Sequence, residues 1–186
     1  MKIRTVAGLA LLFAAGCSSG SGSGGGGGNG NYNNNGIGPS SSGGSAASYC
    51  QAACSKVNQC DSSVDVQVCT ADCQNDGAVS LSKLRAEYVS QVQSCFVATD
   101  CATILTGDAL GDCETQVQAA LTPTPTTTDF CEQAYEADVS CGKNASKGEC
   151  LAAAKQFSDA ALNAAKSCFS KSCNKIDDCV DAELGH

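Results

Sequence analysis

The chain has 186 residues, of which 15 are cysteines, with no tryptophan, one histidine and few aromatic residues. Its 11 lysines and arginines stand against 19 aspartates and glutamates, a balance that disfavours binding to nucleic acids. The cysteine content is typical of an exported protein that relies on disulfides because its apolar core is small, which makes a cytosolic location improbable.

The amino-terminal residues have the pattern of an export signal. Lys2 and Arg4 precede a short apolar run, Val6–Ala15, well below the roughly 20 apolar residues that span a bilayer. The run ends in the letters FAAG before Cys17, and Ser18 follows. This segment resembles the lipobox of bacterial lipoproteins, in which small residues precede the cysteine that receives the lipid.

The resemblance implies that residues 1–16 are a signal peptide and that Cys17 carries the lipid. Ser18 resembles the signal for outer-membrane delivery, so we expect a protein anchored to the outer membrane that faces the periplasm or the cell surface. Loss of Lys2 and Arg4 lowers the basic residues from 11 to 9 and the net charge from −8 to −10. Without Cys17, an even number of cysteines remains, which suits a chain whose other thiols are all paired.

The mature chain is expected to begin with a tether and continue with two related halves. Residues 17–48 hold the lipidated cysteine and a Gly/Ser/Asn-rich linker that cannot bury enough apolar surface to fold. Residues 49–121 and 129–186 are cysteine-rich, and a Pro/Thr-rich linker, 122–128, separates them. The halves share the same cysteine spacing, which indicates an internal repeat.

Both halves are expected to be disulfide-stapled and all-α. Hydroxyl and acidic or amide residues at capping-box spacing mark three helix starts, at Ser48, Ser62 and Ser146. One apolar stripe predicts a helix after a break at Asn75–Gly77, and no breaker interrupts a long Ala-rich helix between Glu149 and Phe169. The stripe consists of Leu81, Leu84, Tyr88, Val92, Cys95 and Phe96.

The cysteines predict four disulfides in the first half and three in the second. Cys54 and Cys73 have no counterpart in the second half, where Tyr135 and Ala154 stand at those positions. Because partners tend to be lost together, we predict a Cys54–Cys73 bond, with a helix pair turning near 61–64 that also brings Cys60 towards Cys69. A competing ladder pairs Cys50 with Cys73 and Cys54 with Cys69, because cysteines four residues apart share a helix face. The cysteines expected in disulfides are Cys50, Cys54, Cys60, Cys69, Cys73, Cys95, Cys101, Cys113, Cys131, Cys141, Cys150, Cys168, Cys173 and Cys179.

The residues that could carry chemistry predict no catalytic site, metal site or cofactor. No Cys-x-x-Cys motif is present for zinc, haem or redox chemistry, and the single imidazole is the terminal His186. Two acidic segments, 107–114 and 177–183, are weak candidates for calcium. We therefore expect a non-catalytic head that binds a protein partner in the envelope or outside the cell, or that has a structural role there, with soft-metal or calcium binding as the alternative.

Exposed aromatic side chains would mark the binding face of such a head. The candidates are Tyr49, Tyr88, Phe96, Phe130, Tyr135, Phe157 and Phe169, although Phe96 and Phe169 fit a core position better.

Overall fold

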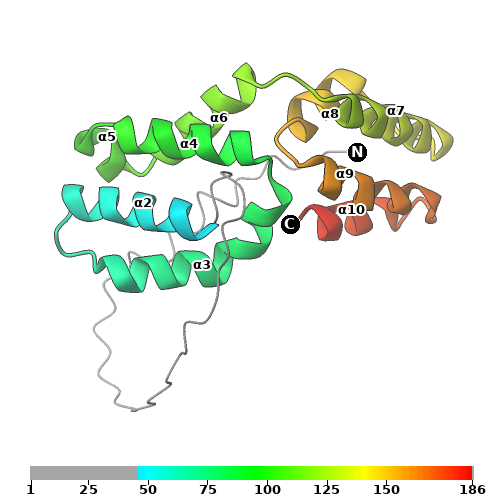
Figure 1. Cartoon of the computed structure of the whole chain (residues 1–186). Coiled ribbons are helices and arrows are strands. Elements are labelled where there is room, and N and C mark those ends of the chain that lie inside the picture. Colours follow the sequence, from blue (N-terminus) through cyan, green and yellow to red (C-terminus); the bar gives the residue numbers. More distant parts are fainter. Residues whose placement is uncertain (1–45, 186) are drawn as a thin grey trace, which may run out of the picture.

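Helices make up the fold of the residues that can be placed, 46–185, in a computed structural model. The predicted all-α class is confirmed (Figure 1). The expected signal peptide, Cys17 and most of the expected tether lie outside the described residues. The helices are α2 (Ala46–Cys60), α3 (Val66–Lys83), α4 (Ala86–Ala98), α5 (Cys101–Thr106), α6 (Ala109–Ala120), α7 (Pro125–Ser140), α8 (Lys147–Ala154), α9 (Asp159–Ala165), the 3-10 helix η1 (Lys166–Ser170) and α10 (Ile176–Leu184).

Helices α2 to α6, which we call the first unit, form a stack in which α3, α2, α4 and α6 follow one another (Figure 1). The turn at 61–65 between α2 and α3 lies where the sequence predicted it. Asp65, rather than Ser62, is the N-cap of α3, because its carboxylate accepts hydrogen bonds from the backbone of Gln67 and Val68. Ser48 lies inside α2, so the predicted helix start there is wrong and the expected tether ends before residue 46.

The break predicted at Asn75–Gly77 is absent, and α3 continues through it to Lys83. Glycine costs about 1 kcal/mol in a helix interior. Gly77 is buried, and two disulfides, at Cys69 and Cys73, fix the preceding turns of α3 to α2. These contacts outweigh the low helix propensity, so the chain breaks at Leu84–Arg85 instead.

The predicted apolar stripe is buried but is divided between two helices. Leu81 lies on α3, Leu84 lies in the break, and the remaining members lie on α4. The apolar members other than Cys95 are at most 6% exposed, namely Leu81, Leu84, Tyr88, Val92 and Phe96. The 3–4 residue spacing therefore identified the core of the first unit correctly and placed the helix boundary wrongly.

Helices α7 to α10, with η1, form a second unit that repeats this arrangement in the order α8, α7, α9 and α10. Helix α7 begins at Pro125, inside the segment 122–128 that the sequence marked as a linker. Thr124 and Thr127 form a reciprocal capping box, and proline suits the first helical turn because its missing N–H is not needed there. Only the start of the expected linker is therefore non-helical.

The long helix predicted between Glu149 and Phe169 is wrong, because α8 ends at Ala154 and α9 begins at Asp159. Phe157 in this break is fully buried and forms a β-bridge with Leu84. Ser158 caps α9 by accepting from the backbone of Ala161. Local sequence favours a continuous helix, but burial of Phe157 and pairing with Leu84 require an extended backbone there.

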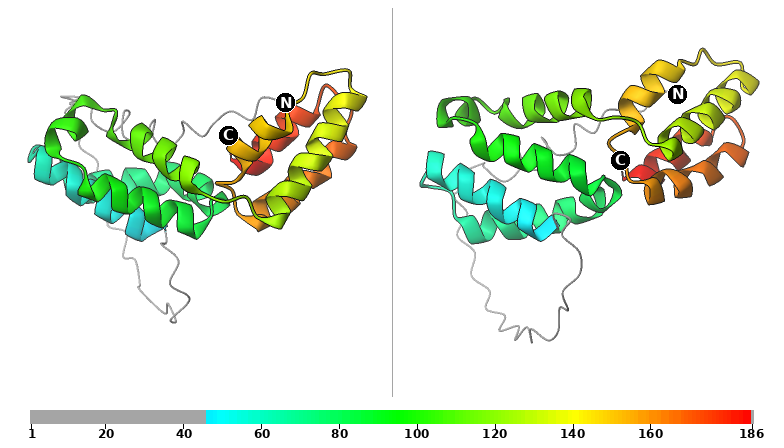
Figure 2. Two further views of the ribbon diagram at one scale, coloured as in Figure 1. Left: turned by 90° about the horizontal axis from the view of Figure 1, so that it is seen from above. Right: turned by 45° about the horizontal axis from the view of Figure 1, so that its top comes forward.

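The two units lie end to end and are joined where these two breaks meet (Figure 2). The backbone of Arg85 donates to the Gln156 carbonyl at 2.9 Å, and that of Ser158 donates to the Lys83 carbonyl at 2.8 Å. The Arg85 guanidinium also donates to the carbonyls of Thr122 and Lys155. Buried side chains from both units belong to one continuous core, so the units are packed against each other rather than merely linked.

The fourteen cysteines of the described residues form seven disulfides, four in the first unit and three in the second. The bonds are Cys50–Cys73, Cys54–Cys69, Cys60–Cys101, Cys95–Cys113, Cys131–Cys150, Cys141–Cys173 and Cys168–Cys179.

The predicted Cys54–Cys73 bond is wrong, and the competing ladder is the one that forms. Cys60 forms a disulfide with Cys101 and not with Cys69. The two cysteines that the second unit lacks belong to different bonds. The cysteines that pair with these two in the first unit correspond in spacing to Cys131 and Cys150, and Cys131 and Cys150 bond each other. The assumption that the partners of a disulfide are absent together is therefore wrong here.

Candidate functional site

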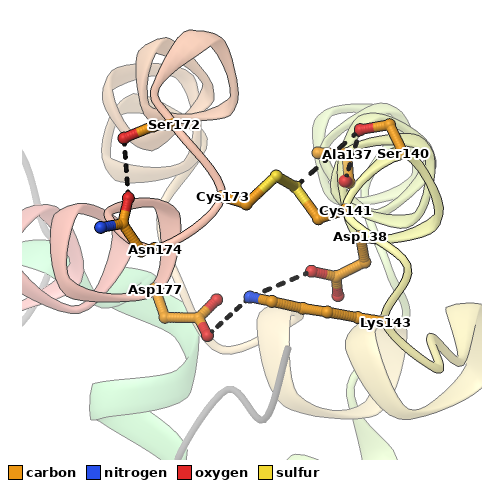
Figure 3. Close-up of a disulfide and its surroundings, with 9 residues drawn as sticks. All are labelled: Ala137, Asp138, Ser140, Cys141, Lys143, Ser172, Cys173, Asn174 and Asp177. Atoms are coloured by element: carbon orange, nitrogen blue, oxygen red, sulfur yellow. Dashed lines mark hydrogen bonds and ion pairs between the residues drawn. A yellow bond between two sulfur atoms is a disulfide. The ribbon is translucent and has the colours of Figure 1, made fainter.

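The most exposed disulfide lies at one end of the second unit, beside a small cluster of charged residues (Figure 3). Cys141 ends α7, and Cys173 lies in the exposed loop before α10. Lys143 donates a 2.8 Å hydrogen bond to Asp177 Oδ2, and its Nζ lies 3.7 Å from Oδ1 of the buried Asp138. The bond and the lysine together fasten the end of α7 to the start of α10.

The electrostatics of this cluster suit structure rather than catalysis. The hydrogen bond that Lys143 donates to Asp177 and the charges of both carboxylates raise the pKa of the Lys143 ammonium above its usual value. The lysine therefore stays charged at neutral pH and is neither a nucleophile nor a base.

The two acidic segments considered for calcium do not converge. Gly107 ends α5 in the left-handed conformation, and Asp112 and Glu114 lie on α6. Asp177 and Asp178 begin α10, and Asp177 is paired with Lys143. Within residues 46–185, no three His, Cys, Asp or Glu side chains are grouped closely enough to hold a metal ion.

Most of the aromatic residues proposed to mark a binding face are core residues. The buried ones are at most 5% exposed, namely Tyr49, Tyr88, Phe96, Phe130 and Phe157. Phe169 is half-buried and packs on Phe130 with ring centroids 5.2 Å apart. Tyr135 is also half-buried, beneath the Lys147 ammonium, which lies 4.6 Å from its ring centroid. No aromatic binding face therefore exists on the described part of the chain.

Tyr135 also lines a small recess beside the Cys131–Cys150 disulfide. Ala134, Asp138, Ala145 and Ser146 complete the lining. The recess has room for about one water molecule, so it is a packing defect rather than a ligand pocket.

Sequence reasoning missed a buried polar cluster inside the first unit, which is the candidate functional site. Glu114 on α6 interacts electrostatically with Tyr49 on α2 and with Tyr88 on α4. Tyr49 is fully buried and Tyr88 is 3% exposed. Glu114 Oε1 and the Tyr49 hydroxyl are both buried and have no hydrogen-bond partner.

Burial determines the acid–base properties of this cluster. Glu114 is half-buried, and desolvation raises its pKa from 4.5 to about 7, because the charged carboxylate loses part of its hydration. Burial, followed by the charge of Glu114, raises the pKa values of both tyrosines well above 10. Glu114 therefore changes protonation near neutral pH, while the two tyrosines stay neutral.

Comparison of the two units shows that this polarity is specific to the first. Tyr49 precedes Cys50 as Phe130 precedes Cys131, and Glu114 follows Cys113 as Val180 follows Cys179. Tyr88 lies seven residues before Cys95, and its counterpart at that distance from Cys168 is Ala161. Phe130, Ala161 and Val180 are all buried. A position-by-position comparison of the two halves would have found the cluster, because its three residues are polar where the matching positions of the second half are apolar.

Comparison of the chain with protein-family models, with curated proteins and with solved structures gave no match. No helix among residues 46–185 has both the length and the apolar composition needed to cross a bilayer.

Proposed function

We propose that this chain is an exported lipoprotein that presents a rigid, non-catalytic helical head outside the cytoplasm, for binding to a partner protein or for a structural role in the envelope. The helical head is residues 46–185, the lipid is attached at Cys17, and the segment between them is a spacer. The proposed location is the outer membrane.

The observation that carries the proposal is the complete pairing of the head's cysteines. Seven disulfides use every cysteine from Cys50 to Cys179, so Cys17 alone is left without a partner in the chain. Disulfides form and persist in oxidising extracytoplasmic compartments. A single unpaired cysteine that directly follows a signal-like segment suits lipidation better than it suits a redox role.

An internal duplication is part of the proposal. Two bonds of the first unit, Cys60–Cys101 and Cys95–Cys113, correspond in the aligned spacing to Cys141–Cys173 and Cys168–Cys179. The helices that these bonds connect pack in the same order in both units. Spacing, bond pattern and packing order therefore agree, which supports a common origin of the two units.

The composition of the head supports binding or structure rather than catalysis. The only histidine is residue 186, so the head itself has no imidazole to serve as a general base. The ion pairs described for Lys143 stabilise a loop, and Glu114 does not line the small recess beside Cys131–Cys150. A rigid duplicated head on a long spacer suits display to a partner, with two related units available for contact.

Metabolic labelling of the full chain in a Gram-negative host, with an alkyne-bearing fatty acid, tests the anchor. The wild-type protein should incorporate label, fractionate with outer membranes and show no free thiol after denaturation without reductant. The matched Cys17→Ser variant should lose the label and the membrane fractionation while keeping all seven disulfides. A wild-type protein that is unlabelled, or that alkylates at cysteines of the head without reduction, would contradict the proposal.

A further inference from the structure

We propose that α6 is a proton-sensitive element, held against α2 and α4 while the Glu114 carboxyl is protonated and released from them when that carboxyl ionises. The inference rests on the buried cluster of the first unit and is independent of where the protein is anchored.

The first step is the surroundings of Glu114. Tyr49 from α2 and Tyr88 from α4 are the titratable groups of the described residues that interact with it electrostatically. Helix α5, which also packs on α6, contributes only the disulfide-bonded Cys101 as a titratable residue. Lys155, which directly follows α8, reaches the other end of α6 and donates to the Ala119 carbonyl. Burial is the cause of the raised pKa of Glu114, with no opposing contribution from a cation among the described residues.

The second step is the cost of ionisation in this place. Glu114 is half-buried, with its Oε1 atom buried near two neutral phenols. A protonated carboxyl can occupy this place at moderate cost, whereas a charge on an unpaired buried oxygen is expensive. Glu114 Oε1 accepts no hydrogen bond, so a charge formed there is not offset by a donor. The simplest relief is a movement of α6 that exposes the buried Oε1 atom to water.

The third step is how α6 is attached. The Cys95–Cys113 disulfide joins it to α4 directly beside Glu114, so release is limited to a movement around that bond. At its other end, Gln118 donates to Gln156 across a long 3.4 Å hydrogen bond, and Leu121 follows α6 into the joint between the units. A movement of α6 therefore takes place around the disulfide and alters the contacts at the joint.

The direction of the pH effect follows from the pKa values. Glu114 has a pKa of about 7 in the folded protein and 4.5 as the ordinary value. An acid whose pKa is raised by folding stabilises the closed form fully below pH 4.5, and this advantage is lost as the pH rises towards and past 7. The closed form of α6 is thus favoured in acid and disfavoured at mildly alkaline pH.

Hydrogen–deuterium exchange of the mature chain, compared between variants at the same pH, tests this inference. At pH 8, peptides covering 109–120 should exchange about tenfold or more faster in the wild type than in Glu114→Gln, whose side chain cannot ionise. At pH 5 the two proteins should exchange within a few-fold of each other. Glu136→Gln, on the exposed face of α7, is the matched control and should behave as the wild type does.

A second variant distinguishes the loss of the ionisable group from misfolding of the Glu114→Gln protein. Glu114→Val copies the residue found at the corresponding position of the second unit, Val180, and should show the same slow exchange of α6 at pH 8. Equal exchange of α6 in the wild type and in both variants at pH 8 would overturn the inference. So would a pH-dependent difference that affects α9 as much as α6, because that result indicates global unfolding.

Discussion

At the scale of single residues, corresponding positions in the two units carry different chemistry on the same framework. Tyr49 and Phe130 are both fully buried and both precede the first cysteine of their unit. The phenol adds one hydroxyl, and that hydroxyl has no hydrogen-bond partner. An unsatisfied buried polar group costs about 1–3 kcal/mol, so the first unit retains a group that weakens its packing. Such retention is what a functional cluster, rather than a purely structural core, would show.

Exchanging tyrosine and phenylalanine between these two positions tests whether the unpaired hydroxyl of Tyr49 destabilises the protein. Tyr49→Phe should raise the free energy of unfolding by roughly 1 kcal/mol, because it removes an unpaired hydroxyl without changing the shape of the ring. The reciprocal Phe130→Tyr should lower it, because it buries a new hydroxyl in an apolar site. Chemical denaturation at pH 5, where Glu114 is protonated, measures both. A destabilised Tyr49→Phe protein would show that the hydroxyl is paired in solution.

At the scale of helices, the sequence predicted which residues are buried better than it predicted where helices end. The class of the fold, the turn at 61–65 and the Ser146 cap follow from periodicity and capping residues alone. The breaks at Leu84 and Phe157 do not, because they depend on a contact between residues far apart in the chain. The cluster at Glu114 was missed for the same reason, since its members come from three different helices.

The disulfide ladder shows how pairing depends on helix register. Cys131 bonds the residue that corresponds to Cys69, whereas Cys50 bonds Cys73, four residues further along. Four residues of helix span about 6 Å, close to one turn. Helix α8 is therefore displaced along α7 by about one turn relative to α3 on α2.

Adding cysteines at the two positions where the second unit lacks them should not reproduce the pairing of the first unit. In the double variant Tyr135→Cys with Ala154→Cys, we expect Cys131 to keep its bond to Cys150 and the two new thiols to stay unpaired, because the displaced register leaves positions 135 and 154 without a cysteine opposite them. Peptide mapping without reduction identifies the bonds. Each single variant, as control, should retain Cys131–Cys150 and show one alkylatable thiol. Bonds from Cys131 to position 154 and from Cys150 to position 135 in the double variant would contradict the register argument.

At the scale of the whole molecule, stability comes from covalent bonds distributed along a thin core. The bonded cysteines lie 11 to 41 residues apart in the sequence. Two of the seven bonds, Cys50–Cys73 and Cys54–Cys69, join α2 to α3. Each native disulfide in a small exported domain contributes about 2–5 kcal/mol. Net stabilities of folded domains are about 5–15 kcal/mol, so the crosslinks together are comparable to the whole stability of the head.

Complete reduction should therefore unfold the head at neutral pH without denaturant. The short helices α5, α8, α9 and α10 have fewer than ten residues each and are too short to persist in water without tertiary packing. Far-ultraviolet circular dichroism should lose most of its helical signal as the last bonds are reduced, and dilution into an oxidising thiol buffer should restore it. The control is the same protein kept oxidised through the same buffer changes. A reduced protein that keeps its helical signal and a cooperative thermal transition would show that the apolar core, rather than the sulfur bonds, holds the two units together.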